Sequence, residues 1–532
     1  MTLTGVVTLL RHVFMQCSAV HSNPFFRSMN QVPPPQESAN EVYAANNADS
    51  SSPLDKDTGI LSARCSSMVF SLPPANKYVT GSNASIHSLP FDILIEIFKH
   101  LPVSDLLHNV PAVCQLWYNV SHTPLLRTRL ALRRQIPSEL IVRAVSSRPM
   151  LRVLRCSALE HAESVLADAI KLCPMLTCLD IGFSALSERA TVILANNLPP
   201  TLLHLNVEGV NTIEVDFITI LTLKCPRLEA LNLSHCVSVC DLCVKIISDK
   251  LHNLRRLNLD GVLWITNAGI LHLANSEAVR NGNLSAIWLD GFELSNSGLN
   301  EFIIRLMHAS KHISDLENSV YRESDNHILG IQQLWISFCD HIEDEAIKSI
   351  ANLSNLVALT LRKTHQVSSV GLSSLFTSES PNHLSQRLSL KYLEHLDLSE
   401  APGVNDSVVL DICNCCGNYL RSLSLNWCWE VTDIGVDQII DTCFSLRQLS
   451  LIGNSTIQGR AFSKIPLKVL HLAILNLTQC NHIADNVLET LALKMPNLFV
   501  FDYFGERVGG GLNDICHFDV SRALNKVPIC TD

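Results

Sequence analysis

Charged residues are scarce in this 532-residue chain. Asp, Glu, Lys and Arg make up 17% of it, whereas 47% of the residues are hydrophobic. So low a charge content excludes a mostly disordered protein and predicts a large buried core. Polar residues interrupt the apolar runs, so we expect no transmembrane helix and no membrane partner. The formal net charge of −10 argues against a nucleic-acid partner, because phosphate binding needs a basic surface.

Motifs for catalysis, metal binding and phosphate binding are also missing. There is no Gly-rich phosphate loop. Cys240 and Cys243 form a Cys-x-x-Cys and Cys413, Cys415 and Cys416 cluster, but no second pair stands nearby at the spacing of zinc ligands. No cysteine and histidine lie in a recognisable nucleophile context. We therefore expect no catalytic residue, no metal and no cofactor.

The N-terminal 85 residues differ in composition from the rest of the chain. Between about residues 28 and 85 they are rich in Ser, Asn, Pro and Ala, which predicts a disordered tail over 1–85. Arg11 and Arg27 precede the first acidic residue, Glu37, as in a mitochondrial transit peptide. Mitochondrial targeting is thus the alternative to the cytoplasmic and/or nuclear location that we expect.

A repeat of about 26 residues fills most of the remaining chain. Its pattern is Leu-x-x-Leu-x-Leu, and most copies follow one another after 25, 26 or 27 residues. The first apolar residues of the thirteen copies are Leu151, Leu176, Leu202, Leu228, Leu254, Leu284, Ile331, Leu356, Leu393, Leu420, Leu446, Leu472 and Leu498. Two longer steps place insertions near 307–327 and 374–389, which either shape a ligand surface or are disordered.

The spacing of the apolar residues predicts an α/β solenoid. Leu-x-Leu alternation is typical of a short strand, and the rest of each period has helical apolar spacing. One strand and one helix cannot bury their apolar faces alone, whereas stacked copies can. We therefore expect a curved solenoid over 131–504, with a parallel sheet inside and helices outside, and a C-terminal tail over 505–532.

Cysteines recur at fixed places in the repeat. They occupy the ninth position of four copies (Cys236, Cys339, Cys428 and Cys480) and lie three residues before the first leucine of three copies (Cys173, Cys225 and Cys443), one of which carries both. In a large chain this pattern indicates buried free thiols in a reducing compartment, not a disulfide framework. Tags such as VTDIG (431–435) follow the strands. These features resemble the cysteine-containing subclass of leucine-rich repeats.

A helical segment precedes the repeats, over residues 86–130. Leu89, Ile93 and Ile97 are four residues apart, which predicts an amphipathic helix that Pro102 ends. Ser104 can cap a second helix, and Pro111 can open a third. We therefore expect three short helices.

This segment resembles an F-box. The matching residues, in order, are Leu89, Pro90, Ile97, Phe98, Leu101, Asp105, Leu106, Val113, Cys114 and Trp117. Two departures affect the register, not the assignment: one extra residue before Val113, and Leu125-Leu126 in place of a terminal Leu-Trp. The chain thus resembles the F-box and leucine-rich-repeat family.

The resemblance implies the substrate-recognition subunit of an SCF-type E3 ubiquitin ligase, without catalytic activity of its own. The F-box would dock a Skp-family adaptor, and through it a cullin and a RING protein. The repeats would bind a protein substrate. The expected adaptor-binding residues are Leu89, Pro90, Ile93, Ile97, Phe98, Leu101, Leu106, Val113, Cys114 and Trp117. The alternatives are a repeat scaffold or inhibitor that acts by binding alone and an enzyme with a site in the insertions.

Alternate residues of each predicted strand point out of the concave face. Among them, Trp288 and Trp335 lie in consecutive repeats, and exposed tryptophan tends to mark binding hot spots. Asp260 and Asp290 lie in the neighbouring column. We therefore predict that these four residues bind a basic or amphipathic substrate segment. The same pattern places Asp502 in the last copy of the tryptophan column.

Overall fold

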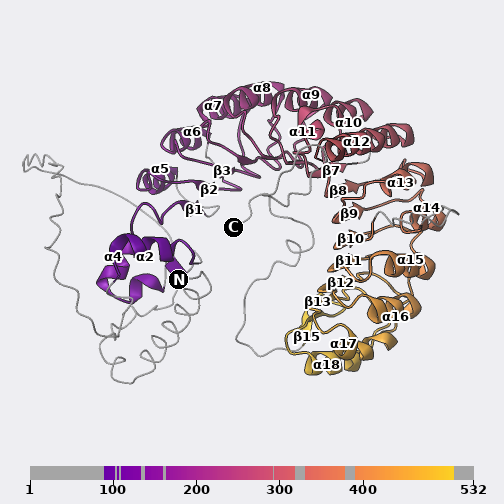
Figure 1. The fold of residues 1–532 in the computed structure, drawn as a ribbon. Helices are drawn as coiled ribbons and strands as arrows, with labels where there is room; N and C mark the ends of the chain where they lie inside the picture. Colours follow the sequence, from indigo (N-terminus) through magenta and orange to yellow (C-terminus); the bar gives the residue numbers. More distant parts are fainter. Residues whose placement is uncertain are drawn as a thin grey trace, which may run out of the picture. The chain divides into compact units, whose positions relative to one another are not determined.

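The computed structural model describes residues 89–101, 105–106, 109–132, 138–159, 163–290, 293–317, 330–338, 340–377 and 390–508. The chain divides into two compact units, Met1–Leu126 and Arg127–Asp532 (Figure 1). The predicted N-terminal tail and most of the second insertion lie outside the described residues, as do 318–329 of the first insertion.

The first unit is helical. Its described elements are α2 (Phe91–Phe98), the 3-10 helix η2 (Val110–Ala112) and α4 (Gln115–Ser121), and residues 105–106 are also helical. Seven buried side chains form one apolar core: Leu94, Ile95, Phe98, Leu106, Val110, Trp117 and Val120. The rings of Phe98 and Trp117 meet edge to face with centroids 5.0 Å apart, so they join α2 to α4.

The second unit contains one 15-stranded sheet whose strands follow chain order. The strands are β1 (Arg129–Ala131), β2 (Val153–Arg155), β3 (Cys178–Asp180), β4 (His204–Asn206), β5 (Ala230–Asn232), β6 (Arg256–Leu259), β7 (Ala286–Asp290), β8 (Gln333–Ser337), β9 (Ala358–Leu361), β10 (His395–Asp397), β11 (Ser422–Ser424), β12 (Gln448–Ser450), β13 (Ile474–Asn476), β14 (Phe499–Phe501) and β15 (Arg507–Val508). All neighbours are parallel except β14 and β15. This order confirms the predicted solenoid.

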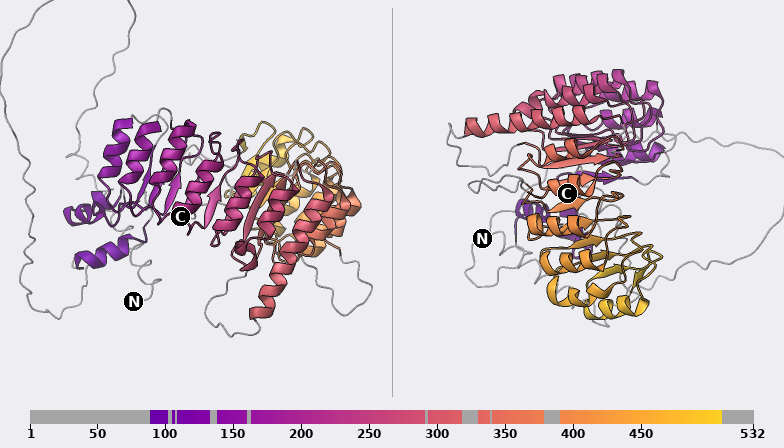
Figure 2. Two further views of the ribbon diagram at one scale, coloured as in Figure 1. Left: turned by 90° about the horizontal axis from the view of Figure 1, so that it is seen from above. Right: turned by 90° about the vertical axis from the view of Figure 1, so that its right-hand side faces the viewer.

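Helices connect the strands and cover the outer side of the arc (Figure 1). They are α5 (Ser138–Ser146), α6 (Glu163–Lys171), α7 (Glu188–Asn197), α8 (Val215–Lys224), α9 (Asp241–Lys250), α10 (Asn267–Ala274), α11 (Glu277–Arg280), α12 (Asn296–Glu317), α13 (Asp344–Ile350), α14 (Ser369–Ser374), α15 (Asp406–Cys416), α16 (Asp433–Thr442), η3 (Arg460–Lys464), α17 (Ile465–Lys468) and α18 (Asp485–Lys494). The first predicted insertion begins inside α12, which projects beyond its neighbours (Figure 2).

The sheet extends past both predicted boundaries. β1 pairs with β2 before the first recognised copy, and β15 closes the far edge inside the predicted C-terminal tail. Neither strand carries the full leucine pattern, so the repeat does not predict it. In the last copy the register differs by one residue, because Phe501 pairs with Asn476. The placement of Asp502 in the column of strand residues is therefore wrong.

A tag lies at the start of a helix, and a side chain from the preceding repeat forms hydrogen bonds with it, as the tag VTDIG at the start of α16 shows. Asp406 at the start of α15 accepts hydrogen bonds from the backbone N–H (2.9 Å) and hydroxyl (2.6 Å) of Thr432, the N-cap of α16. It also accepts one from the N–H of Gly435 (3.0 Å), where a Cβ would lie 2.5 Å from its Oδ1. The tag therefore needs Thr for the cap and Gly for space.

A left-handed backbone conformation recurs seven positions after the first apolar residue of the described repeats. The members are Ala158, Phe183, Gly209, His235, Gly261, Phe338, Lys363, Glu400, Trp427, Gly453, Gln479 and Gly505. Large side chains alternate with glycine in part of this series. A Cβ on Gly209 would lie 2.6 Å from the ring of Phe183, so the glycine leaves space for the ring of the preceding repeat.

The described repeat cysteines are buried. Cys173, Cys225, Cys236, Cys428, Cys443 and Cys480 are free thiols of the core, as expected, and Cys339 lies outside the described residues. The Cys236 thiol donates to the Val207 carbonyl at 3.2 Å, across the repeat boundary. Burial raises the pKa of the Cys236 thiol to about 12, so it stays protonated and unreactive at neutral pH.

Candidate protein-binding surfaces

Helix α2 is apolar on two faces. Leu94, Ile95 and Phe98 are buried in the helical unit, as their spacing of three and four residues allows. On the opposite face, Ile93 is 47% exposed and Ile97 is half-buried, whereas Phe91, in the first turn, is 41% exposed. A second apolar face that finds no cover within its own small unit is typical of a surface that binds another protein.

The ten predicted adaptor-binding residues fall into three groups. Pro90 and Ile93 are exposed. Half-buried are Leu89, Ile97, Leu101, Val113 and Cys114. Fully buried in the core of the unit are Phe98, Leu106 and Trp117. These three hold the helices together in the free unit, and their role in adaptor binding stays a prediction.

Sequence spacing missed three exposed apolar side chains of this unit. Phe91, Tyr118 and Leu125 are 41%, 44% and 47% exposed. Tyr118 stacks on His122 with ring centroids 4.0 Å apart.

The concave face of the sheet corrects the predicted pair of exposed tryptophans. Trp288 is only 6% exposed, and Asp290 is 4% exposed. Trp288 lies between Asn258 on β6 and Trp335 on β8. Because neighbouring strands are about 4.8 Å apart, such large side chains cover one another. Trp288 and Asp290 thus have little surface to offer a ligand in this conformation.

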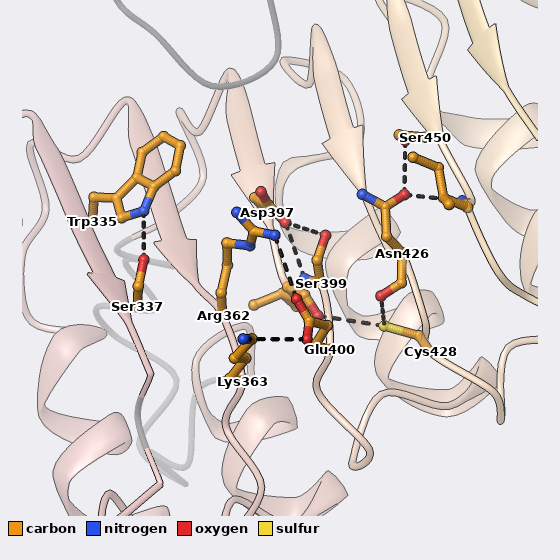
Figure 3. A network of polar contacts seen from close by, with 12 residues as sticks. Trp335, Ser337, Arg362, Lys363, Asp397, Ser399, Glu400, Asn426, Cys428 and Ser450 are labelled. Atoms are coloured by element: carbon orange, nitrogen blue, oxygen red, sulfur yellow. Dashed lines mark hydrogen bonds and ion pairs between the residues drawn. The ribbon is translucent and has the colours of Figure 1, made fainter. Parts of the chain in front are cut away.

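Trp335 and Asp260 do come together, through a shared serine. Trp335 is half-buried, and its indole N–H donates to the hydroxyl of Ser337 at 3.0 Å (Figure 3). Asp260 forms a side-chain hydrogen bond with the same serine. Burial raises the pKa of Asp260, and the bond to Ser337 partly opposes this. The two residues therefore form one polar and aromatic site across β6–β8.

Basic residues adjoin this site on the next repeat. Arg362 Nη2 lies 3.4 Å from Glu400 Oε1, and Lys363 Nζ lies 3.8 Å from Glu400 Oε2 (Figure 3). Lys363 also lies over the ring of Phe338, 3.9 Å from its centroid. The middle of the concave side thus carries both signs of charge.

The most exposed tryptophans lie in loops after the strands, not on the strands. Trp264 is 63% exposed, Trp429 is 59% exposed and Trp427 is 38% exposed. Trp427 occupies the left-handed position after β11, and Trp429 follows two residues later. These loop tryptophans were not predicted, because the strand pattern indicates exposure only for strand positions.

The described residues hold no group of three or more His, Cys, Asp or Glu side chains placed to bind a metal ion. Within the same residues, no helix has the length and apolarity needed to cross a membrane.

Known proteins resemble both the helical unit and the solenoid. Residues 86–133 match the F-box-like family model. The chain is 26% identical over 337 residues to the DNA repair protein RAD7 of Saccharomyces cerevisiae, covering 58% of this chain and 55% of RAD7. It is 27% identical over 173 residues to F-box/LRR-repeat protein 4 of Bos taurus, covering 32% of this chain and 26% of that protein. The chain therefore spans about half of one curated relative and a quarter of the other.

A solved structure shares the fold. The crystal structure of the yeast Rad7 and Elc1 complex contains a chain that aligns with a TM-score of 0.51 at 19% identity, over 78% of this chain and 91% of that one. The chain is thus similar to F-box and leucine-rich-repeat proteins: its helical unit matches the F-box-like model, and its solenoid shares the fold of the Rad7 chain.

Proposed function

We propose that the chain is the substrate-recognition subunit of an SCF-type ubiquitin ligase. The apolar face of α2 formed by Pro90, Ile93 and Ile97 carries this proposal. It lies inside the segment that matches the F-box-like family. A Skp-family adaptor would cover this face and link the chain to a cullin-RING ligase. The solenoid would hold a protein substrate, so the chain would contribute binding and no catalytic group, in the cytoplasm and/or nucleus.

The comparison with Rad7 supports the proposal, because that relative was solved in complex with a second protein, Elc1. A scaffold or inhibitor that acts by binding alone remains the competing function. Such a scaffold or inhibitor would need no adaptor, so adaptor binding distinguishes the two functions.

Changing Ile93 to Asp is expected to abolish capture of a Skp-family adaptor without unfolding the unit. Ile93 is 47% exposed, so a carboxylate there stays solvated in the free chain but would be buried without a partner in the complex. We expect adaptor affinity to fall by about 100-fold, or about 3 kcal/mol, in a titration with purified adaptor. The control is Glu96→Ala, an exposed change on the same helix. If the wild-type chain binds no adaptor, the proposal fails.

Changing Trp335 to Ala together with Asp260 to Asn is expected to remove substrate contacts and leave adaptor binding intact. Both residues are half-buried on the concave side and share Ser337. Proximity labelling in cells would compare the partners of this variant with those of Trp288→Ala, a change that tests the buried neighbour. An unchanged set of partners for the Trp335 and Asp260 variant would remove this site from the proposal.

A further inference from the structure

Two exposed tryptophans lie in the turn that follows β11. Trp427 is 38% exposed and Trp429 is 59% exposed, and the buried Cys428 lies between them in the chain. We call them the β11 tryptophan pair. The six-membered ring of Trp427 packs against Gly453 in the next repeat, where an added Cβ would collide with three atoms of the ring. Both indoles keep an aromatic surface open to solvent, and such tryptophans are enriched at protein-binding sites.

The turn that carries the pair is fixed to the repeats on both sides. The backbone N–H of Trp427 donates to the Ile452 carbonyl at 2.7 Å. The side-chain oxygen of Asn426 accepts a hydrogen bond from the backbone N–H of Ile452 at 2.9 Å (Figure 3). On the other side, the Cys428 thiol donates to the Leu398 carbonyl at 3.3 Å. A ligand would meet indoles whose positions are already set, which lowers the entropic cost of binding.

The same edge of the solenoid already holds a cation on an aromatic ring. The left-handed positions of four successive repeats are Phe338, Lys363, Glu400 and Trp427. Lys363 Nζ lies 3.9 Å from the centroid of the Phe338 ring and 3.8 Å from Glu400 Oε2. This cation is therefore held between a ring and a carboxylate. Among the described residues, no Lys or Arg side chain lies over either indole of the β11 tryptophan pair.

The strand-to-helix segments around the pair are acidic. Segments 397–407, 424–434 and 450–459 contain no Lys and no Arg, but they contain Asp397, Glu400, Asp406, Glu430 and Asp433. All but Glu430 have ion-pair or hydrogen-bond partners within the solenoid. Glu430 directly follows Trp429 and is exposed, and no Lys or Arg in the described part of the chain pairs with it. One carboxylate beside the pair is thus available to a positively charged ligand.

We propose that the β11 tryptophan pair binds an arginine or lysine side chain from a segment of a partner protein. The cation would lie over an exposed indole with the Glu430 carboxylate beside it, as Lys363 lies over Phe338 beside Glu400. Of the aromatic side chains, tryptophan attracts cations most strongly, and the planar group of arginine also stacks on it. We therefore expect arginine to bind more tightly than lysine. This inference deepens the proposed function, on which it rests for the source of the segment, a ubiquitination substrate.

The test titrates the full chain with synthetic peptides of equal length, made of four Gly-Arg, Gly-Lys or Gly-Gln repeats. At an ionic strength of about 0.15 M, calorimetry should show that affinity falls in that order. Replacing Trp427 and Trp429 by Leu should weaken binding of the Gly-Arg peptide by about fivefold or more. Leucine keeps an apolar side chain there but has no ring that attracts a cation.

Glu430→Gln tests the site with both rings in place. This exposed change should weaken binding of the Gly-Arg peptide by about threefold, and by less at high salt. It also decides the question if the leucine variant does not fold. Trp264→Leu is the matched control, because Trp264 is 63% exposed in the loop after β6 and its loss should leave affinity unchanged.

Equal affinity of the Gly-Arg and Gly-Gln peptides would overturn the proposal, because the ligand would then need no charge. So would equal affinity of the wild-type chain and the folded variants at the pair or at Glu430. Adaptor capture is measured separately on the same proteins. A wild-type chain that binds the Gly-Arg peptide but no adaptor would remove the proposed function and keep this site, whereas adaptor capture without peptide binding would remove this site alone.

Discussion

Replacing Trp117 by Ala is expected to unfold the helical unit and leave the solenoid folded. Trp117 is 1% exposed and packs edge to face on Phe98. Truncating a buried tryptophan costs about 3–5 kcal/mol, and a unit of about 40 residues has little more than that to lose. Limited proteolysis should therefore cleave the variant within residues 89–126 while the repeats stay protected.

The matched control is Trp429→Ala in the solenoid. Trp429 is 59% exposed, so its loss should change stability by less than about 0.5 kcal/mol. Adaptor capture should fail for Trp117→Ala because the docking face of α2 no longer has a support, whereas Ile93→Asp should abolish capture with the unit intact. Equal protease resistance of wild type and Trp117→Ala would show that the helical core is held by something other than this contact.

Replacing Gly453 by Ala is expected to lower the free energy of unfolding of the C-terminal repeats by about 2–4 kcal/mol. Gly453 has φ +74°, which costs an L residue about 1–2 kcal/mol. Its Cβ would also collide with the indole of Trp427 in the preceding repeat, and such overpacking costs about 1–3 kcal/mol. Urea unfolding, followed by hydrogen exchange of β12 and β13, measures the loss.

Gly505 provides the control for the cost of the left-handed backbone conformation alone. Its φ is +79°, but a Cβ there would meet only Thr478, at 3.5 Å. Gly505→Ala should therefore lose only the backbone contribution. Adding Trp427→Ala to Gly453→Ala should recover most of the difference between the two glycine variants, since the space of the indole becomes free. Additive losses in the double variant would mean that the indole does not set the cost at Gly453.

Local sequence patterns were sufficient for the fold. The repeat leucines predict the strands because Leu-x-Leu alternation and a period of about 26 residues leave one way to bury every apolar face. Leu423 illustrates this, since it is fully buried and pairs in register with Leu396 and Leu449. The residues that match the F-box pattern likewise predicted a helical unit, because the pattern is defined by the order of these residues in the sequence.

Surface exposure was decided by the tertiary structure. Trp288 and Trp335 occupy equivalent strand positions, yet one is buried and the other half-buried, because the neighbours across the sheet decide which ring is covered. Ile93, predicted to bind the adaptor, is on the outer face of α2, whereas Phe98, predicted for the same role, is buried, because a helix apolar on two faces leaves the choice to what packs against it. The sequence by itself determined the solenoid and the docking segment, since both depend on local periodicity. Which side chains face a partner depends on contacts between residues far apart in the chain, so only the folded structure decided it.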